Sequence, residues 1–318
     1  MHKESTRKGQ LLAISDGSLT ESDARAMLER IRWPNGVHCL FEGCGGAEVY
    51  RIETEAKTLK SGRKVGPRHL YKCKACRRQF SVTKGTIFED SKIPLRAWLT
   101  VMYRMCSSKK GVSARQIGRE FGISVECAWF MLHRVRFAMT DKNPSLLEGI
   151  IEADETYIGG KPRGHRLHRI GQYPTMSERI KAAWERKAPV FGIKERDGRI
   201  RASATGKLTR RGVQETIRQN VARGSRVMTD EHMYYRNLGY LLPHDVIRHK
   251  SEYVRGEVHT QGIESFWALL KRGIVGQFHK VSVKYLHRYI SEFCYRHNNR
   301  KNENVFELTI ARGLGVSL

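Results

Sequence analysis

Three acidic residues between positions 150 and 270 lie in segments that read as two β-strands and a helix. The run IEADETYIGG reads as a β-strand that carries Asp154 towards a core. Asp230 ends the short apolar strand in SRVMTD, and Glu264 lies on the amphipathic helix in GIESFWALLKRG. Their carboxylates offer the hard oxygen ligands that suit Mg²⁺ or Mn²⁺. We therefore predict a site for two such ions that catalyses phosphoryl transfer.

Two further acids and one lysine accompany these three. Glu152 and Glu155 are rival ligands in the same strand, and we expect strand alternation to place both on the face opposite Asp154. Lys271 follows Glu264 by seven residues, or two helical turns, so both project from nearly the same face of the helix. Any single acid could instead be a helix cap or a surface charge, which are the commoner roles.

Four cysteines in the N-terminal third form two close pairs. Four residues separate Cys39 from Cys44, and two separate Cys73 from Cys76. Two such pairs a few tens of residues apart are typical of a tetrahedral thiolate site, so we predict one structural Zn²⁺ ion. The alternative is a set of four buried thiols without metal.

The charge of the chain points to a polyanionic partner. The 318 residues carry a formal net charge of +26, although 40% of them are hydrophobic, as in an ordinary folded protein. Such an excess favours nucleic acid as the partner, with an anionic membrane surface as the second candidate. No apolar run approaches the roughly 20 residues of a membrane span, and no secretory signal is recognisable. We therefore expect a cytoplasmic protein with reduced cysteines.

Two segments could contact DNA phosphates. Within 94–140, SARQIGREFGISVECAWFMLHRVR reads as two helices around a glycine-centred turn, which is a helix-turn-helix pattern. The insert 161–188 is basic and has little strand character, so it is either a phosphate-contacting loop or a solvated one. The arginines that we expect to meet phosphates, or else to lie on solvated faces, are Arg115, Arg119, Arg134, Arg136, Arg163, Arg166 and Arg169.

The elements that must position these residues alternate between strands and helices. We expect strands near 150–158, 189–195, 199–205, 226–230 and 244–249, and helices near 209–222, 262–272 and 284–298. This order predicts an α/β or α+β domain behind a small basic front end.

The motifs together resemble a known family. IEADETYIGGK, TDEHMYYRNL, EYVRG and HTQGIESFWALLKRGIVGQFHKVS closely resemble bacterial insertion-sequence transposases of the fifteen-ninety-five group, and YKCKACRRQFSVTKGTIFEDSKIPL resembles the zinc ribbon of that family. The resemblance implies a ribonuclease-H-like mixed sheet with flanking helices, preceded by a zinc ribbon and a helix-turn-helix. It also implies that Asp154, Asp230 and Glu264 bind the metal and that Lys271 is the basic residue after the glutamate. Gln261 departs from the family pattern, in which asparagine is frequent shortly before the glutamate.

On this basis we divide the chain into a helical segment (1–34), a zinc ribbon (35–90), a helix-turn-helix region (91–145) and a catalytic domain (146–318). The resemblance implies cleavage of double-stranded DNA at element ends and joining of the 3′ hydroxyls to a target, in a bacterial nucleoid, by a homo-oligomer. Lys271 and Arg272 would hold the DNA backbone. The alternatives are a zinc-ribbon DNA-binding protein without catalysis and a ribonuclease-H-fold nuclease without strand transfer.

Overall fold

The chain forms two compact units, which are described separately. The computed structural model describes residue 9 and residues 11–58, 61–62, 64–159, 187–247 and 258–317. Unit 1 comprises Met1–Ser108, Ala114–Ala138 and Asn302–Leu318, and unit 2 comprises Lys109–Ser113 and Met139–Lys301. The last residues of the chain, which the sequence division places in the catalytic domain, thus group with unit 1.

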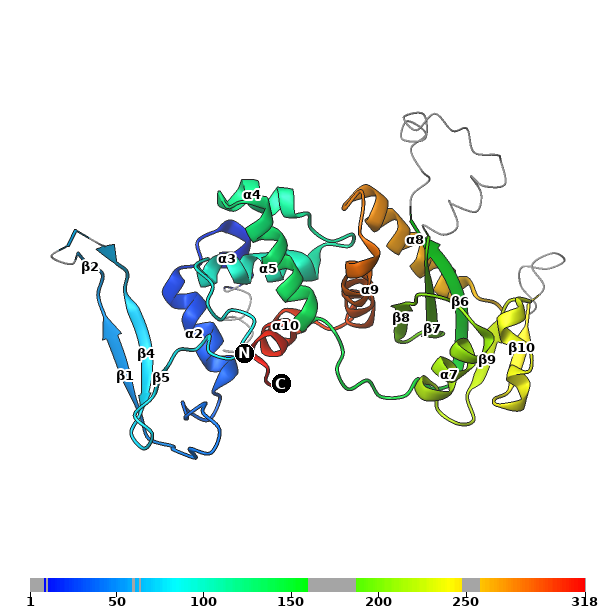
Figure 1. Cartoon of the computed structure of the whole chain (residues 1–318), viewed down its shortest axis with the longest axis horizontal. Helices are drawn as coiled ribbons and strands as arrows, with labels where there is room; N and C mark the ends of the chain where they lie inside the picture. Colours follow the sequence, from blue (N-terminus) through cyan, green and yellow to red (C-terminus); the bar gives the residue numbers. More distant parts are fainter. Residues whose placement is uncertain are drawn as a thin grey trace, which may run out of the picture. The chain divides into compact units, whose positions relative to one another are not determined.

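Unit 1 contains a small three-stranded antiparallel sheet (Figure 1). Its strands, in the order β1-β4-β5, are Val49–Thr54, Arg68–Cys73 and Gln79–Phe80. A two-stranded ribbon pairs β2 (Lys57–Thr58) with β3 (Lys64–Val65). Trp33 packs edge-on against Tyr71 and Phe80, which gives this small sheet an aromatic core.

Unit 1 includes the helices α2 (Glu21–Arg32), α3 (Leu95–Ser107), α4 (Ala114–Phe121), α5 (Val125–Ala138) and α10 (Val305–Leu314). A capping box at Thr20 begins α2. Between α4 and α5, Gly122 has a φ of +62°, a left-handed conformation that glycine adopts without steric cost, and the Ser124 hydroxyl caps α5. The predicted helix–turn–helix is therefore present, and α10 packs against α2, α3 and α5.

Unit 2 is built on a five-stranded mixed sheet in the order β10-β9-β6-β7-β8 (Figure 1). These strands are His244–Val246, Arg226–Thr229, Ile150–Ile158, Ala188–Glu195 and Ile200–Ala204. β6, β7 and β8 are antiparallel neighbours, whereas β9 runs parallel to β6 and β10 parallel to β9. The helices are α7 (Arg210–Asn220), α8 (Gln261–Gly276) and α9 (Val283–Asn298), with short 3₁₀ turns η3 (Met233–Tyr235) and η4 (Leu238–Tyr240). A mixed sheet with flanking helices confirms the predicted fold class.

The two faces of this sheet carry different cores. Ile158 and Val190 pack with residues of α8 and α9, among them Phe266 and Ile290. On the other face Ile151 and Ala153 pack with α7 and the 3₁₀ turns. Even-numbered residues of β6 therefore face α8, and odd-numbered residues face the opposite core. Among the described residues, no helix combines the length and apolar character needed to cross a membrane.

Candidate active site and zinc centre

Asp154 and Asp230 are brought together by the pairing of two parallel strands. The register pairs Glu152 of β6 with Met228 of β9. Asp154 lies two residues after Glu152, and Asp230 lies two residues after Met228. Asp230 is the first residue after β9, and its Oδ1 accepts a hydrogen bond from the backbone N–H of His232 at 3.0 Å. The two carboxylates that the sequence predicts as ligands are thus neighbours at the end of β9.

The environment of Asp154 disfavours an isolated negative charge. Its Oδ2 accepts a hydrogen bond from the indole Nε1 of Trp267 at 3.0 Å. Burial first, and then the negative charges of Glu155 and Asp230, raise the pKa of Asp154 to about 7. A cation beside the two aspartates would offset this repulsion.

Glu264 lies in the first turn of α8, on an exposed position. Its Oε1 accepts a hydrogen bond from the Thr260 hydroxyl at 2.8 Å. Among the described residues, the four cysteines are the one group of histidine, cysteine, aspartate or glutamate side chains compact enough to hold a metal ion as they stand. The structure therefore brings Asp154 and Asp230 together. Glu264 lies on α8, which packs over this face of the sheet, but its carboxylate does not form a compact cluster with the two aspartates.

The expectation that Glu152 lies opposite Asp154 is wrong. Residues two apart in a strand share a face, and the Glu152 carboxylate points to α8, where it accepts a hydrogen bond from the backbone N–H of Ile263 at 2.8 Å. It also accepts a hydrogen bond from Nε of Arg196 at 3.2 Å. Glu152 is therefore engaged within the protein, although it lies on the same face as Asp154.

Glu155 lies on the other face of β6, as predicted. The hydroxyl of Tyr235 donates a hydrogen bond to its carboxylate, and Nδ1 of His232 lies 3.7 Å from its Oε1. Burial, opposed by the Tyr235 hydrogen bond, raises the pKa of Glu155. The negative charge of Asp230 acts in the same direction as burial, so Glu155 belongs to the same acidic neighbourhood without sharing the face of Asp154.

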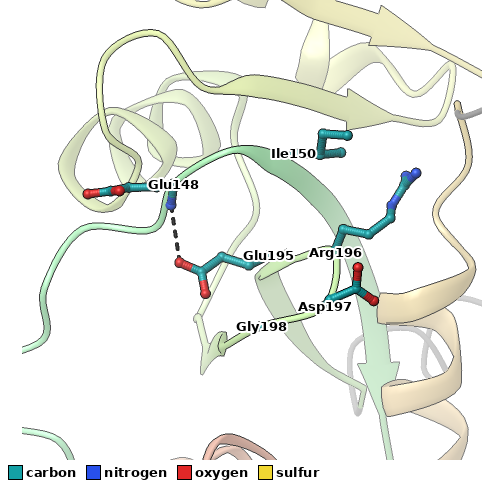
Figure 2. A pocket seen from close by; sticks show the side chains of 6 residues that line it. All are labelled: Glu148, Ile150, Glu195, Arg196, Asp197 and Gly198. Carbon is teal, nitrogen blue, oxygen red and sulfur yellow. Dashed lines mark hydrogen bonds between the residues drawn. The ribbon is translucent and has the colours of Figure 1, made fainter.

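A pocket of about 460 Å³ lies at the beginning of β6 and is lined by Glu148, Ile150, Glu195, Arg196, Asp197 and Gly198 (Figure 2). The Glu195 carboxylate accepts hydrogen bonds from the backbone N–H of Glu148 at 3.1 Å and from Arg199. These contacts fasten the β7–β8 turn to the start of β6. The residues that line this pocket do not include Asp154 or Asp230.

The arginines that the sequence assigns to DNA have different settings. Arg115 and Arg119 are exposed on α4, and Lys271 and Arg272 are exposed on α8. Arg134 is also exposed, and it donates hydrogen bonds to the carbonyls of Ile87 and Glu89 at 3.1 and 2.9 Å. Arg136 is only 1% exposed. Its side chain lies in the interior of unit 1.

Nearly all of the basic insert lies outside the described residues, which resume at residue 187. The three arginines Arg163, Arg166 and Arg169 are among those not described. Their predicted contact with phosphates stays a prediction.

The four cysteines of unit 1 form a zinc-binding cluster. Their sulfur atoms all lie within 4.8 Å of one another, with 3.7 Å between Cys39 and Cys76 and 3.5 Å between Cys44 and Cys73. A tetrahedral zinc ion bound at about 2.3 Å holds its sulfurs roughly 3.8 Å apart, so the donor set fits zinc. A side chain at Gly46 would bring a Cβ within 2.8 Å of the Cys73 sulfur, so glycine is required beside the cluster.

Two residues near the acidic pair, Trp267 and Gly192, were not singled out from the sequence, and Glu152 was weighed there only as a rival metal ligand. Trp267 contacts Asp154, Glu152 holds the start of α8, and Gly192 lies across from Asp154 on β7. One signal was readable, because a glycine inside an apolar strand often marks a close approach by another group. The partner of that glycine was not readable, since Trp267 comes from a distant segment.

Comparison with known proteins agrees with these observations. Residues 146–298 match the ISXO2-like transposase domain, and residues 19–79 match the transposase zinc-ribbon domain. A protein of the transposable element ISH50 from Halobacterium salinarum, itself uncharacterised, is 28% identical over 259 residues, which cover 80% of this chain and 83% of the relative.

Proposed function

This chain belongs to the fifteen-ninety-five (IS1595) group of insertion-sequence transposases, and we propose that it cuts DNA at element ends and joins the freed 3′ hydroxyls to target DNA. The observation that carries this proposal is the adjacency of Asp154 and Asp230 on two parallel strands, beneath a helix whose first turn bears Glu264. Each aspartate is an oxygen ligand of the kind that phosphoryl-transfer enzymes use.

The residues present fit divalent ions of the Mg²⁺ or Mn²⁺ type. Asp154 and Asp230 offer only oxygen atoms, and their charges repel each other in a partly buried place. We assign both to the metal site, with Glu264 as the third ligand. When bound, a pair of such ions activates the attacking oxygen and stabilises the leaving one.

The remaining residues of the proposed site bind and orient the DNA. Lys271 and Arg272 lie two turns along α8 from Glu264 and are exposed, so their charges can hold a phosphate backbone beside the carboxylates. In unit 1, Arg115 and Arg119 on α4 are available for the phosphates of an element end. Because two element ends are processed, we propose that the protein acts as a homo-oligomer, with one subunit at each end.

The test separates chemistry from binding. Asp154→Asn, Asp230→Asn and Glu264→Gln keep the side-chain size but weaken the grip on the metal, so each should reduce cleavage of a labelled end on the order of a hundredfold or more. Gel-shift affinity for the same end should stay near that of the wild type. Lys271→Ala should instead raise the DNA concentration needed for half-maximal rate.

The matched control is Glu231→Gln, because Glu231 is an exposed acid next to Asp230 in the chain. It should cleave like the wild type. Full activity in Asp154→Asn would overturn the assignment of the metal site. Cleavage without joined products in a target plasmid would instead identify a nuclease, and binding without metal-dependent cleavage would identify a DNA-binding protein.

A further inference from the structure

We propose that Trp267 is a positioning residue that orients Asp154 for metal binding, and that Gly192 leaves the space that Trp267 needs. The inference rests on the proposed function, because it concerns how one metal ligand is held. Neither Trp267 nor Gly192 would bind the ions itself.

The indole of Trp267 holds one specific oxygen of Asp154. Its Nε1 donates a hydrogen bond to Oδ2 at 3.0 Å, which fixes the orientation of the carboxylate. Trp267 is itself 4% exposed and packs in the core between the sheet and α8, so its ring has a fixed place. A carboxylate held in this way presents its other oxygen in one direction.

Gly192 makes this contact sterically possible. The register places Gly192 of β7 directly across from Asp154 of β6. A Cβ at Gly192 would lie 2.6 and 2.7 Å from two carbons of the Trp267 ring, and 3.2 Å from the Ile263 side chain. Real Cβ atoms do not approach other atoms so closely, so any other residue at this position would displace the indole from the sheet.

The same tryptophan links the two halves of the proposed site. Trp267 follows Glu264 by three residues, so both side chains belong to the same side of α8. The indole hydrogen bond therefore fastens the segment of helix that carries Glu264 to the strand that carries Asp154. Loss of this bond should loosen both ligands at once.

Trp267→Phe tests the inference, because it keeps an aromatic ring and removes the N–H donor. Partners of metal ligands typically contribute about 10–100-fold to metal affinity, so we expect the dissociation constant for Mn²⁺ to rise by that factor. Calorimetry on the zinc-loaded protein measures it without reference to catalysis. Gly192→Ala should produce a shift in the same direction by moving the ring, and the affinity for DNA should not change in either variant.

Trp98→Phe is the matched control. Trp98 is 1% exposed, and its indole donates to the Ser91 hydroxyl at 3.0 Å in unit 1, so its replacement also removes a buried indole hydrogen bond. This variant should bind Mn²⁺ like the wild type. Wild-type Mn²⁺ affinity in both Trp267→Phe and Gly192→Ala would overturn the positioning role, provided that Asp154→Asn lowers the affinity. If Asp154→Asn also binds Mn²⁺ normally, the proposed metal site itself is wrong.

Discussion

The carboxylate of Glu152 accepts a hydrogen bond at 2.8 Å from the backbone N–H of Ile263, a residue 111 positions further along the chain. Thr260, which precedes α8, makes no side-chain hydrogen bond that caps the helix. Glu152 supplies that acceptor from the strand, and its negative charge suits the positive end of the helix dipole. Since Asp154 lies two residues further on the same face, this contact sets the position of the start of α8 relative to the proposed metal ligands.

Glu152→Ala should destabilise the protein by about 3–5 kcal/mol, because it leaves a helix N-terminus without its acceptor and removes the buried carboxylate that pairs with a partly buried arginine. Glu152 is 0% exposed, and the arginine is Arg196. Glu152→Gln keeps an acceptor and should cost less. Urea unfolding measures both.

Glu215→Ala is the control for this loss, since Glu215 pairs with Arg218 on the exposed surface of α7. An exposed ion pair contributes little to stability, because water and salt screen it. Equal losses of stability in Glu152→Ala and Glu215→Ala would contradict the role assigned to Glu152.

Cys73→Ser should remove the bound zinc and expose the small sheet of unit 1 to proteolysis, because metal binding and folding are one equilibrium in such a site. Unit 2 should keep its protease resistance. Metal analysis and limited proteolysis give the two readouts. Cys127→Ser is the control, since Cys127 is exposed on α5 and outside the cluster. A protein with no zinc and a fully resistant small sheet would refute the prediction.

Arg115→Gln combined with Arg119→Gln should weaken DNA binding and reduce the slope of log affinity against log salt by about 2, since each lost phosphate contact removes about one unit. Gel-shift titrations at several salt concentrations measure the slope. Arg136→Gln should leave the slope unchanged and lower the unfolding free energy by roughly 1–3 kcal/mol, because a buried guanidinium would be replaced. A change of slope in Arg136→Gln, with normal stability, would show that this side chain reaches DNA.

The stability of the protein should fall as the pH decreases from about 6.5 to about 4. Burial, and then the positive charges of Arg300 and Lys194, lower the pKa of His297 to about 4. Between these values the unfolded chain binds a proton at this position that the folded chain does not, so acid favours unfolding. His297→Gln should flatten the dependence of the urea midpoint on pH over this window. The same change at His287, an exposed residue of α9, should not.

Local patterns predicted the strands well where the chain alternates or is apolar throughout. The strand expected near 150–158 is β6, and those expected near 226–230 and 244–249 are β9 and β10. Helix α8 begins next to the expected position and extends four residues beyond the expected end, to Gly276. Gly273 does not end the helix but lies within it, close to Phe293. Asp230 could be singled out because it ends an apolar segment, whereas the roles of Asp154, Asp230 and Glu264 as metal ligands stay predictions.

Contacts between segments that are distant in the chain could not be predicted from local sequence patterns. Arg134 and Arg136 look alike in the sequence, but the first binds loop carbonyls and the second is buried. The assignment of Glu152 to the wrong face was avoidable, because the period of a strand is two. The contact between Trp267 and Asp154 was not predictable, since it depends on the room that Gly192 leaves for the indole by having no side chain.

The position of α10 has a consequence for the order in which the protein can fold during synthesis. Helix α10 packs with α2, α3 and α5, yet it is translated after every strand of unit 2. Domains of a growing chain fold as their residues leave the ribosome. Unit 2 can therefore complete its sheet while unit 1 still waits for its last helix. A polypeptide cut short after Lys301 would retain the proposed metal ligands and lose part of the core beneath the helix–turn–helix.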